Sequence, residues 1–216
     1  MDYDKAVTSS SSHYIGGDIM NDAKTIITIS RQFGSGGKEI GEILAKRMGV
    51  RCLDRQVLYL AAEQMGSSNV DMESILDSAY QTADSNLGSF GTMGFEMVPI
   101  YNKMFREQAK VILKAAEKGS AVFVGRCADA VLRDVPNHYS FFIYADEAFR
   151  AERAEKYYDG KTLKDLEKED KTRERYYNYY TGRKWGDPQN YDMMINTSRI
   201  SLEKAADLIC KYVGIE

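Results

Sequence analysis

Cysteine and histidine are scarce in this chain of 216 residues, which contains three cysteines and two histidines. Cys52, Cys127 and Cys210 are far apart in the sequence, so they form neither a metal-binding spacing nor a disulfide framework. With only His13 and His138, neither a zinc site nor a histidine-based catalytic triad is expected. The chain also lacks any run of about 18 apolar residues, which argues against a transmembrane helix.

Neither sign of charge dominates the sequence, which has a net charge of −3. This balance argues against a wholly basic protein built to bind nucleic acid. With 44% hydrophobic and 28% charged residues, the composition is that of an ordinary globular protein and excludes disorder over most of the chain. Residues 1–14 lack the basic and apolar regions of a signal peptide. We therefore expect a cytoplasmic protein with no membrane or nucleic-acid partner, and a homodimer is left open.

The chain divides near residue 23. Residues 1–22 are polar, rich in serine and without periodicity, so we expect a disordered extension or a remnant of an expression vector. Residues 23–216 alternate between short apolar segments and amphipathic ones, without internal repeats. This length is sufficient to bury a core without disulfides, so we expect one domain.

The first regular residues predict a strand, a loop, a helix and a second strand. Residues 25–30 are apolar and β-branched, which predicts a buried strand, and the glycine cluster at 33–37 predicts a loop. Apolar residues then recur at helical spacing over 40–48, and 50–53 predicts another strand. A strand–helix–strand unit of this kind predicts a parallel sheet.

The rest of the chain continues this alternation. Three more short apolar segments predict strands at 121–124, 140–144 and 193–195. Helices are expected at 55–66, 70–85, 100–118, 127–133, 146–158, 161–182 and 201–212. The fold class is therefore α/β, with three layers and a five-stranded parallel sheet buried on both faces. Ligands of such folds bind beyond the carboxyl ends of the strands, where this sequence places Arg31, Asp54, Arg126 and Asp146.

A glycine-rich loop between a strand and a helix is suited to bind phosphate. Its glycines let the backbone approach the anion, and free N–H groups at the helix start face it. The full pattern is G-x-x-x-x-G-K-[ST]. Counted back from Lys38, Gln32 stands in place of the first glycine and Glu39 in place of the Ser or Thr.

A second register of this loop, counted from Gly36, is equally open. Arg31 then replaces the first glycine, and Gly37 replaces the lysine. In either register the pattern is incomplete, and a tight turn without a ligand is the alternative. Clustered glycines lower the stability of the folded state through their conformational entropy, so they are expected where the backbone must approach a ligand, which favours a phosphate loop. The expected phosphate-binding residues are Arg31, Gly34, Ser35, Gly36, Gly37, Lys38 and Glu39.

The segment Ile29–Gly41 resembles the opening of the cytidylate-kinase-like proteins. These are relatives of bacterial cytidylate kinase in the P-loop nucleoside-monophosphate kinase fold. Similar stretches follow in the same order at 54–55, 124–129, 142–145, 170–177 and 191–197. The resemblance covers roughly residues 24–213.

This resemblance implies a core, a helical acceptor-binding insert at 55–98 and a lid at 157–190. It implies ATP and Mg²⁺ as cofactors, with no metal ligand assigned among the side chains. It assigns catalysis to Lys38, Arg126 and Arg173, acceptor binding to Asp54, Arg126 and Asp129, and lid contacts to Lys171, Arg173 and Arg175. The chain departs from the family pattern at Cys127, where glycine is expected, and at Glu39, where the Mg²⁺-binding hydroxyl is expected.

The leading interpretation is an ATP-dependent phosphotransferase that resembles cytidylate kinase. It would move the γ-phosphate to a nucleoside monophosphate or a similar small acceptor, a reaction that depends on positioning and positive charge. Two alternatives stay open: a kinase of a non-nucleotide metabolite, and a nucleotide sensor whose atypical loop no longer supports catalysis. RNA binding by the tyrosine-rich segment 176–180 is disfavoured by the acidic net charge.

Overall fold

A computed structural model describes residues 24–64 and 93–215. The expected extension at 1–22, the expected helix at 70–85 and much of the predicted insert at 55–98 lie outside the described residues. In the described part, no helix is long and apolar enough to cross a membrane.

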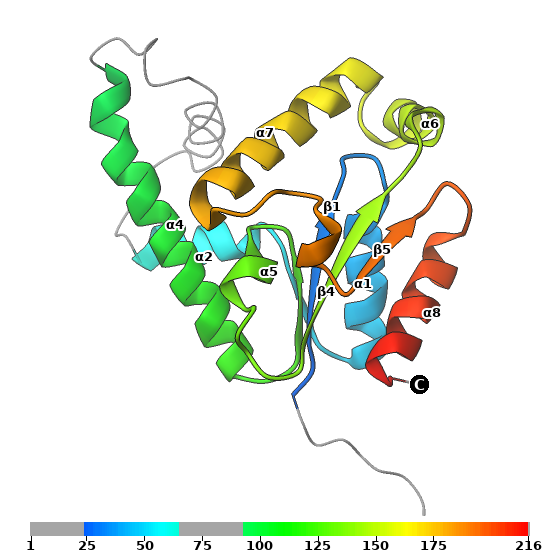
Figure 1. Cartoon of the computed structure of the whole chain (residues 1–216), viewed down its shortest axis with the longest axis horizontal. Coiled ribbons are helices and arrows are strands. Elements are labelled where there is room, and N and C mark those ends of the chain that lie inside the picture. The colour runs from blue at the N-terminus through cyan, green and yellow to red at the C-terminus, as the bar shows by residue number, and fades with distance from the viewer. Residues whose placement is uncertain (1–23, 65–92, 216) are drawn as a thin grey trace, which may run out of the picture.

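Five parallel strands form the sheet (Figure 1). They are β1 (Ile26–Arg31), β2 (Arg51–Leu53), β3 (Ala121–Val124), β4 (His138–Tyr144) and β5 (Met193–Asn196). Their order in the sheet is β2-β3-β1-β4-β5, so the strand that leads into the glycine loop lies at the centre. The predicted α/β class and the five-stranded parallel sheet are confirmed.

Helices cover both faces of this sheet. They are α1 (Gly37–Met48), α2 (Gln56–Gln64), α4 (Met93–Glu117), α5 (Ala128–Val131), α6 (Glu147–Tyr157), α7 (Leu163–Thr181) and α8 (Leu202–Val213), with a short 3₁₀ helix at Pro188–Asn190. One apolar cluster packs α1 and α8 on one face, and a second packs α2, α4 and α5 on the other. In Figure 1 the strands run upward, and α6 and α7 lie above their carboxyl ends.

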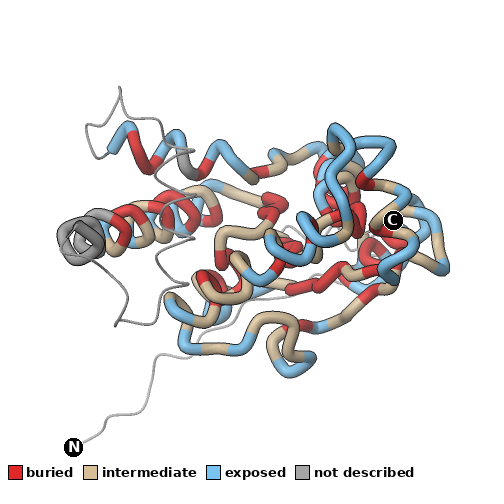
Figure 2. Tube along the Cα trace, turned by 90° about the horizontal axis from the view of Figure 1, so that it is seen from above, coloured by how far each residue is buried: buried red, intermediate tan, exposed pale blue. Residues whose placement is uncertain are grey.

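The alternation of side chains along β1 explains the two apolar clusters. Ile27 and Ile29 contribute to the cluster with α1 and α8, while Ile26 contributes to the cluster with α2 and α4. All three are at most 1% exposed, because successive side chains of a strand point to opposite faces. Figure 2 shows buried residues along the inner sides of the chain trace and exposed ones along its outside. The sheet is therefore a rigid base for the loops at its carboxyl edge.

The helix expected at 100–118 begins earlier, at Met93, and so includes Pro99. The expected start lay after the glycine- and methionine-rich residues 86–98, which predicted a loop. The element boundaries elsewhere differ from the expected ones by a few residues.

His138 begins β4 at the edge of the sheet opposite the glycine loop, and burial lowers the pKa of its imidazole from 6.5 to about 4. Its Nε2 lies 2.8 Å from Oγ1 of Thr28, which is itself buried. The neutral ring is favoured in the folded state. The contribution of His138 to the free energy of unfolding is therefore fully present above pH 6.5 and is lost as the pH falls toward 4. We expect a loss of about 2 to 3 kcal/mol between pH 7 and pH 4 from this group.

Urea unfolding at several pH values checks this prediction. His138→Gln should flatten the acid side of the stability profile relative to the unaltered protein. Parallel profiles for the two proteins between pH 7 and pH 4 would show that His138 does not carry the effect.

Candidate functional site

The glycine loop connects β1 to α1 and is shaped by two left-handed glycines. Gly34 has φ +80° and Gly36, the N-cap of α1, has φ +81°. A Cβ on Gly34 would lie 2.9 Å from Cδ2 of Leu166, and one on Gly36 would lie 2.5 Å from Cδ2 of Leu202. Both backbone conformation and space therefore require glycine. Helix α1 thus starts just beyond the carboxyl end of the central strand, where its free N–H groups favour an anion.

Hydrogen bonds from distant segments fix the shape of this loop. The Ser35 hydroxyl donates to the carbonyl of Gln32 at 2.9 Å, and the Thr197 hydroxyl donates to the carbonyl of Ser35 at 2.7 Å. The side-chain oxygen of Gln32 accepts from the N–H of Ala145 at 3.2 Å. Ser35 is fully buried, so its hydroxyl serves the loop itself. Thr197 lies in a stretch of the family resemblance but was not singled out as a site residue.

Lys38 and Glu39 make their contacts with helices. The Lys38 ammonium lies 3.7 Å from Glu42 one turn along α1, and the side chain is 60% exposed. Glu39 forms an ion pair with Arg153 of α6. The structure therefore places both side chains against α1 and α6 rather than at the strand ends.

Arg31 and Asp54 come together at the carboxyl edge of the sheet, although they end different strands. Nη2 of Arg31 lies 3.5 Å from Oδ1 of Asp54, and the side chains are 17% and 15% exposed. That distance gives an ion pair without a hydrogen bond, and Oδ1 of Asp54 is buried with no hydrogen-bond partner among residues 24–64 and 93–215. One oxygen of the Asp54 carboxylate is therefore available to accept a hydrogen bond at this edge.

The turn after β3 is backbone-strained. Gly125, Arg126 and Cys127 all have positive φ, at +71°, +60° and +56°. A left-handed conformation costs about 1–2 kcal/mol for a residue with a side chain, and such strain is concentrated at functional sites. The family resemblance implies glycine at position 127, and the left-handed backbone of Cys127 is the conformation that glycine adopts without strain.

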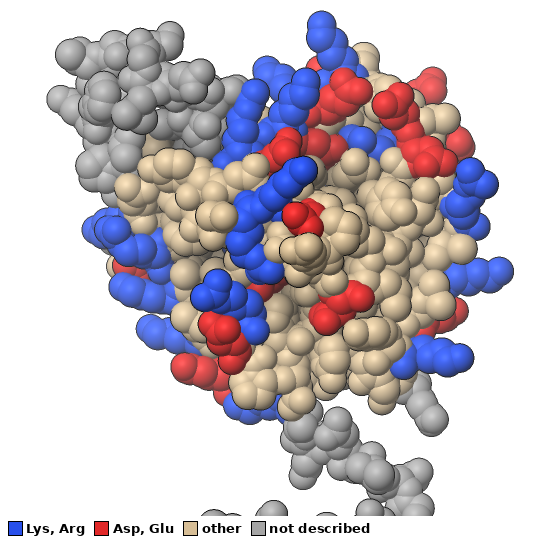
Figure 3. Space-filling model, viewed as in Figure 1, with Lys and Arg blue, Asp and Glu red and all other residues tan. Residues whose placement is uncertain are grey.

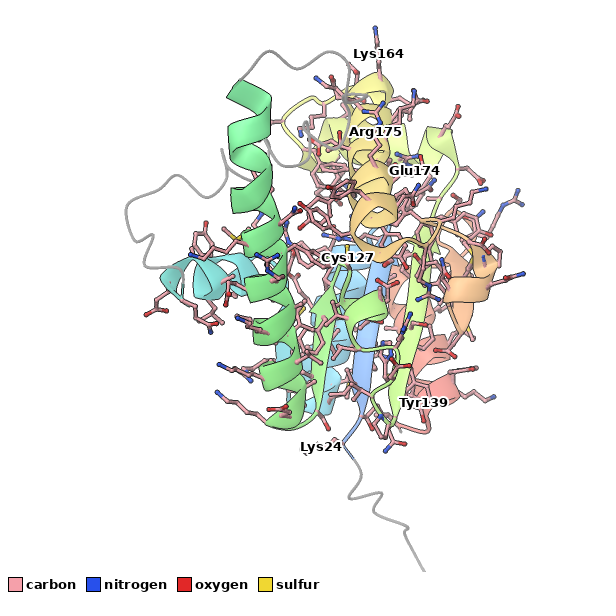
Figure 4. The ribbon with its side chains drawn as sticks, turned by 60° about the vertical axis from the view of Figure 1, so that its left-hand side comes forward. Lys24, Cys127, Tyr139, Lys164, Glu174 and Arg175 are labelled. Atoms are coloured by element: carbon pink, nitrogen blue, oxygen red, sulfur yellow. The ribbon has the colours of Figure 1, made fainter. Side chains whose placement is uncertain are left out.

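Cys127 fills space beneath α7. It is 4% exposed and belongs to a cluster with Tyr101, Tyr176 and Tyr177. Figure 4 places it where α7 meets the carboxyl edge of the sheet, far from Lys24 and Tyr139 at the opposite edge. Burial raises the pKa of its thiol well above the ordinary value, so the thiolate that a nucleophile needs is disfavoured.

Asp129 is buried inside the fold, at 2% exposure. Its carboxylate accepts a hydrogen bond from the Tyr177 hydroxyl at 2.6 Å and another from the Ser30 hydroxyl at 3.3 Å. Burial raises the pKa of Asp129 despite these donors. The side chain thus connects β1, α5 and α7, and its expected contact with the acceptor stays a prediction.

Helices α6 and α7 hold the glycine loop through one residue. The N–H of Phe33 donates to Asp170 of α7 at 2.7 Å, and the carbonyl of Phe33 accepts from Nε of Arg150 of α6 at 2.7 Å. Arg150 and Asp170 also form an ion pair with each other. Arg150 is only 5% exposed, which nothing in the highly charged segment 146–158 indicated. Its burial could be recognised only from the helix that packs on it.

The basic residues of α7 divide between the loop and the solvent. Arg173 lies 4.9 Å over the ring of Phe33, and its Nη1 donates to the carbonyl of Arg31 at 3.4 Å. Lys171 is exposed, and Arg175 is partly buried. Figure 3 shows Lys and Arg interleaved with Asp and Glu over this helix. As its spacing predicted, Arg173 faces a different direction from Lys171.

Gln108 of α4 is a buried residue that no sequence signal singled out. It is 1% exposed, and neither atom of its side-chain amide has a hydrogen-bond partner within the described residues. The neighbouring turns of the same helix, at Met104 and Ile112, pack against the sheet. An unsatisfied buried amide costs about 1–3 kcal/mol, so Gln108 is unexplained by packing alone.

The donor atoms fit a phosphate ligand better than a built metal cage. Within the described ranges, no group of three or more His, Cys, Asp or Glu side chains could hold a metal ion. Mg²⁺ in kinases is held largely by substrate phosphates and water, with one or two carboxylates, so this donor set is compatible with a nucleotide that carries Mg²⁺.

The comparisons with known proteins concern the family and the fold of the chain. The model of the cytidylate kinase-like family matches residues 26–199. A crystal structure of an uncharacterised protein from Eubacterium ventriosum ATCC 27560 is 29% identical, with a TM-score of 0.64, over 89% of this chain and 100% of the other. No curated protein matches the chain.

Two more distant structures show the same fold. Shikimate kinase from Bacteroides thetaiotaomicron is 10% identical, with a TM-score of 0.53, over 89% of this chain and 100% of that one. A gluconokinase from Sinorhizobium meliloti 1021 is 13% identical, with a TM-score of 0.52, over 88% of this chain and 92% of that one. Because the family model covers most of the chain and the sheet and loop are those of P-loop kinases, the protein belongs to the cytidylate kinase-like family.

Proposed function

We propose that this protein is an ATP-dependent kinase that transfers the γ-phosphate to a nucleoside monophosphate or a similar small acceptor, with Mg²⁺. One observation carries the proposal. The glycine loop at the start of α1 is flanked by Arg31, Asp54 and Arg126, which follow or end the neighbouring strands β1, β2 and β3. Phosphoryl transfer requires positive charge and positioning more than covalent chemistry, and this edge of the sheet supplies both.

On the donor side, the backbone of the loop would bind the phosphates of ATP. Gly34 and Gly36 allow the close approach, and the N-terminus of α1 adds the positive end of its dipole. Mg²⁺, when it is bound with ATP, supplies neutralisation of the phosphate charge. Arg173, stacked on Phe33, adds a cation beside the loop.

On the acceptor side, Asp54 and Arg126 would bind the second substrate. The buried Oδ1 of Asp54 lacks a hydrogen-bond partner among the described residues, so it is suited to accept a hydrogen bond from an acceptor hydroxyl. Arg126 follows β3 in the strained turn, and its planar fork can bind two phosphate oxygens. We assign Arg126 to the acceptor phosphate or the transferred one.

Residues 157–190 would exclude water during transfer. Their helix α7 contacts the loop through Asp170 and Arg173, which is where a lid over bound phosphate would lie. Excluding water prevents wasteful hydrolysis of ATP.

Two alternatives are supported by particular observations. Lys38 contacts Glu42, and neither register of the loop has the Ser or Thr that follows the lysine in the full pattern. Both observations favour a sensor that binds nucleotide without catalysis. The kinases that share the fold at low identity act on shikimate and gluconate by their names, which keeps a non-nucleotide acceptor open.

One experiment separates these functions. The protein is incubated with ATP and Mg²⁺ and a panel of nucleoside monophosphates, shikimate and gluconate, and ADP release is measured beside direct nucleotide binding. We expect turnover with CMP, dCMP or another nucleoside monophosphate. Turnover only with a non-nucleotide acceptor would correct the substrate class. Tight ATP binding without turnover of any acceptor would support the sensor and contradict the kinase.

Arg126→Lys should lower kcat/KM for the acceptor by roughly 10-fold, because lysine keeps the charge but loses the paired donors. Steady-state kinetics measure the change. Arg133→Lys is the matched control, since Arg133 is 62% exposed and forms a surface ion pair with the neighbouring Asp134. Equal kinetics for Arg126→Lys and the unaltered protein would leave Arg126 with a structural role.

A further inference from the structure

The structure decides between the two registers of the glycine loop. Gly36 is the left-handed N-cap of α1, and the helix begins at Gly37. In the full pattern the second glycine directly precedes the lysine at the helix start. Gly36 is therefore the second glycine, so that Gly37 stands at the lysine position and Arg31 at the position of the first glycine. Relative to the pattern, the chain has exchanged glycine and a cation between two positions.

These two positions compete for the same space. A Cβ on Gly37 would lie 2.5 Å from Cβ and 3.0 Å from Cγ of Arg31. A side chain of any length at position 37 would therefore collide with the stem of Arg31. Only one of the two positions can carry a long cationic side chain, and here it is the strand position.

The guanidinium of Arg31 lies between the phosphate loop and the acceptor side. It reaches across the carboxyl end of β3, where a Cβ on Gly125 would lie 1.9 Å from Nη1. Its Nη2 is 3.5 Å from Asp54 at the end of β2. In the sheet, β3 lies between β1 and β2, so the cation is directed from the donor strand toward the acceptor strand. Glycine at 37 and at 125 leaves the room for this path.

Lys38 does not offer a competing cation. Its side chain is 60% exposed and lies along α1 with its ammonium 3.7 Å from Glu42. It is one residue past the lysine position in the register that the structure supports. The contact with Glu42 is a surface ion pair of the ordinary i,i+4 kind.

We propose that Arg31 takes the place of the P-loop lysine and binds the phosphoryl group that is transferred. This inference rests on the proposed kinase function. The guanidinium donates two N–H groups to oxygens of that group, and the Asp54 carboxylate holds it at the edge of the sheet until phosphate is bound. Charge that develops on the transferred group is stabilised from the strand side, whereas the standard lysine acts from the helix side. Glycines 37 and 125 are the structural partners of Arg31.

The test compares Arg31→Met, which keeps the apolar stem and removes the charge, with Lys38→Met at the rival position. The control is Lys46→Met, an exposed lysine in the last turn of α1. Calorimetry measures the binding of ATP with Mg²⁺ and of inorganic tripolyphosphate, and kinetics with the accepted acceptor measure kcat and KM. For Arg31→Met we expect the Kd for both polyphosphates to rise about 10-fold, and kcat to fall about 100-fold or more. Lys46→Met should change each value by less than about 2-fold, and Lys38→Met should lose less than Arg31→Met does.

A restored standard loop provides a second arm. Arg31→Gly alone should behave like Arg31→Met, and Arg31→Gly combined with Gly37→Lys should regain at least about 10-fold of the lost polyphosphate affinity. If Arg31→Met does not fold, as judged by its unfolding midpoint, Arg31→Lys decides instead, with an expected 10-fold fall in kcat, roughly the cost of losing the fork.

The outcomes separate this inference from the function on which it rests. A protein that binds polyphosphate through Arg31 but phosphorylates no acceptor supports the assignment of Arg31 and overturns the kinase. Unchanged polyphosphate affinity and kcat in Arg31→Met overturns the assignment, whatever the acceptor. A loss in Lys38→Met that equals the loss in Arg31→Met overturns it as well.

Discussion

Replacing Asp170 by alanine should lower the free energy of unfolding by about 3–5 kcal/mol, the usual cost of breaking a buried ion pair on one side. The side chains of Arg150 and Asp170 are 6% and 11% exposed, so the variant would leave a buried guanidinium without its carboxylate. The N–H of Phe33 in the glycine loop would lose its acceptor at the same time. Urea denaturation at neutral pH measures the change.

Glu169→Ala is the matched control on the same helix. Glu169 pairs with Lys161 at 3.1 Å, but both side chains are 42% exposed, so the loss should stay below about 1 kcal/mol. Removing both partners, as Arg150→Met with Asp170→Leu, should recover most of the lost stability. Similar losses for Asp170→Ala and Glu169→Ala would show that burial of the pair has little effect.

Gly36→Ala should weaken ATP binding by roughly 100-fold or more, because a displacement of about 1 Å in a binding loop can have an effect of this size. The new Cβ would meet Leu202 at 2.5 Å, and alanine is strained at φ +81°. The backbone strain favours a shift of the loop, which takes its N–H groups away from the phosphates. Calorimetry with ATP and Mg²⁺ measures the affinity.

Gly49→Ala controls for backbone strain. Gly49 caps the other end of α1 at φ +63°, and a Cβ there would meet nothing within 4 Å. It should destabilise the protein by about 1–2 kcal/mol and leave ATP affinity unchanged. An intact ATP affinity in Gly36→Ala would remove the loop from the binding site.

The strands and the glycine loop were predictable because their signals are local. The apolar segments expected at 25–30 and 121–124 correspond to β1 and β3 within one residue. A buried strand must be apolar on both faces, and a left-handed helix cap favours glycine, so both leave marks in a few consecutive residues. These marks were enough to predict the fold class and the place of the loop.

The tertiary structure alone decided which side chains reach the strand ends. Sequence reasoning assigned catalysis to Lys38 and only phosphate binding to Arg31. The cap at Gly36 and the space beside Gly37 and Gly125 favour Arg31 instead. The strand order that brings Asp54 toward Arg31 is likewise invisible in the sequence, because it depends on which strands pair.

Burial of charge was the second property that only the tertiary structure decided. Arg150 and Asp170 lie in helical segments whose many charges indicate a solvated face, and Asp129 looked like a residue at an open acceptor site. Their partners, Phe33, Tyr177 and each other, lie 20 to 137 residues away in the chain. A charged side chain can be buried when such partners satisfy it, and the chain brings those partners together only by packing α6 and α7 over the carboxyl edge of the sheet.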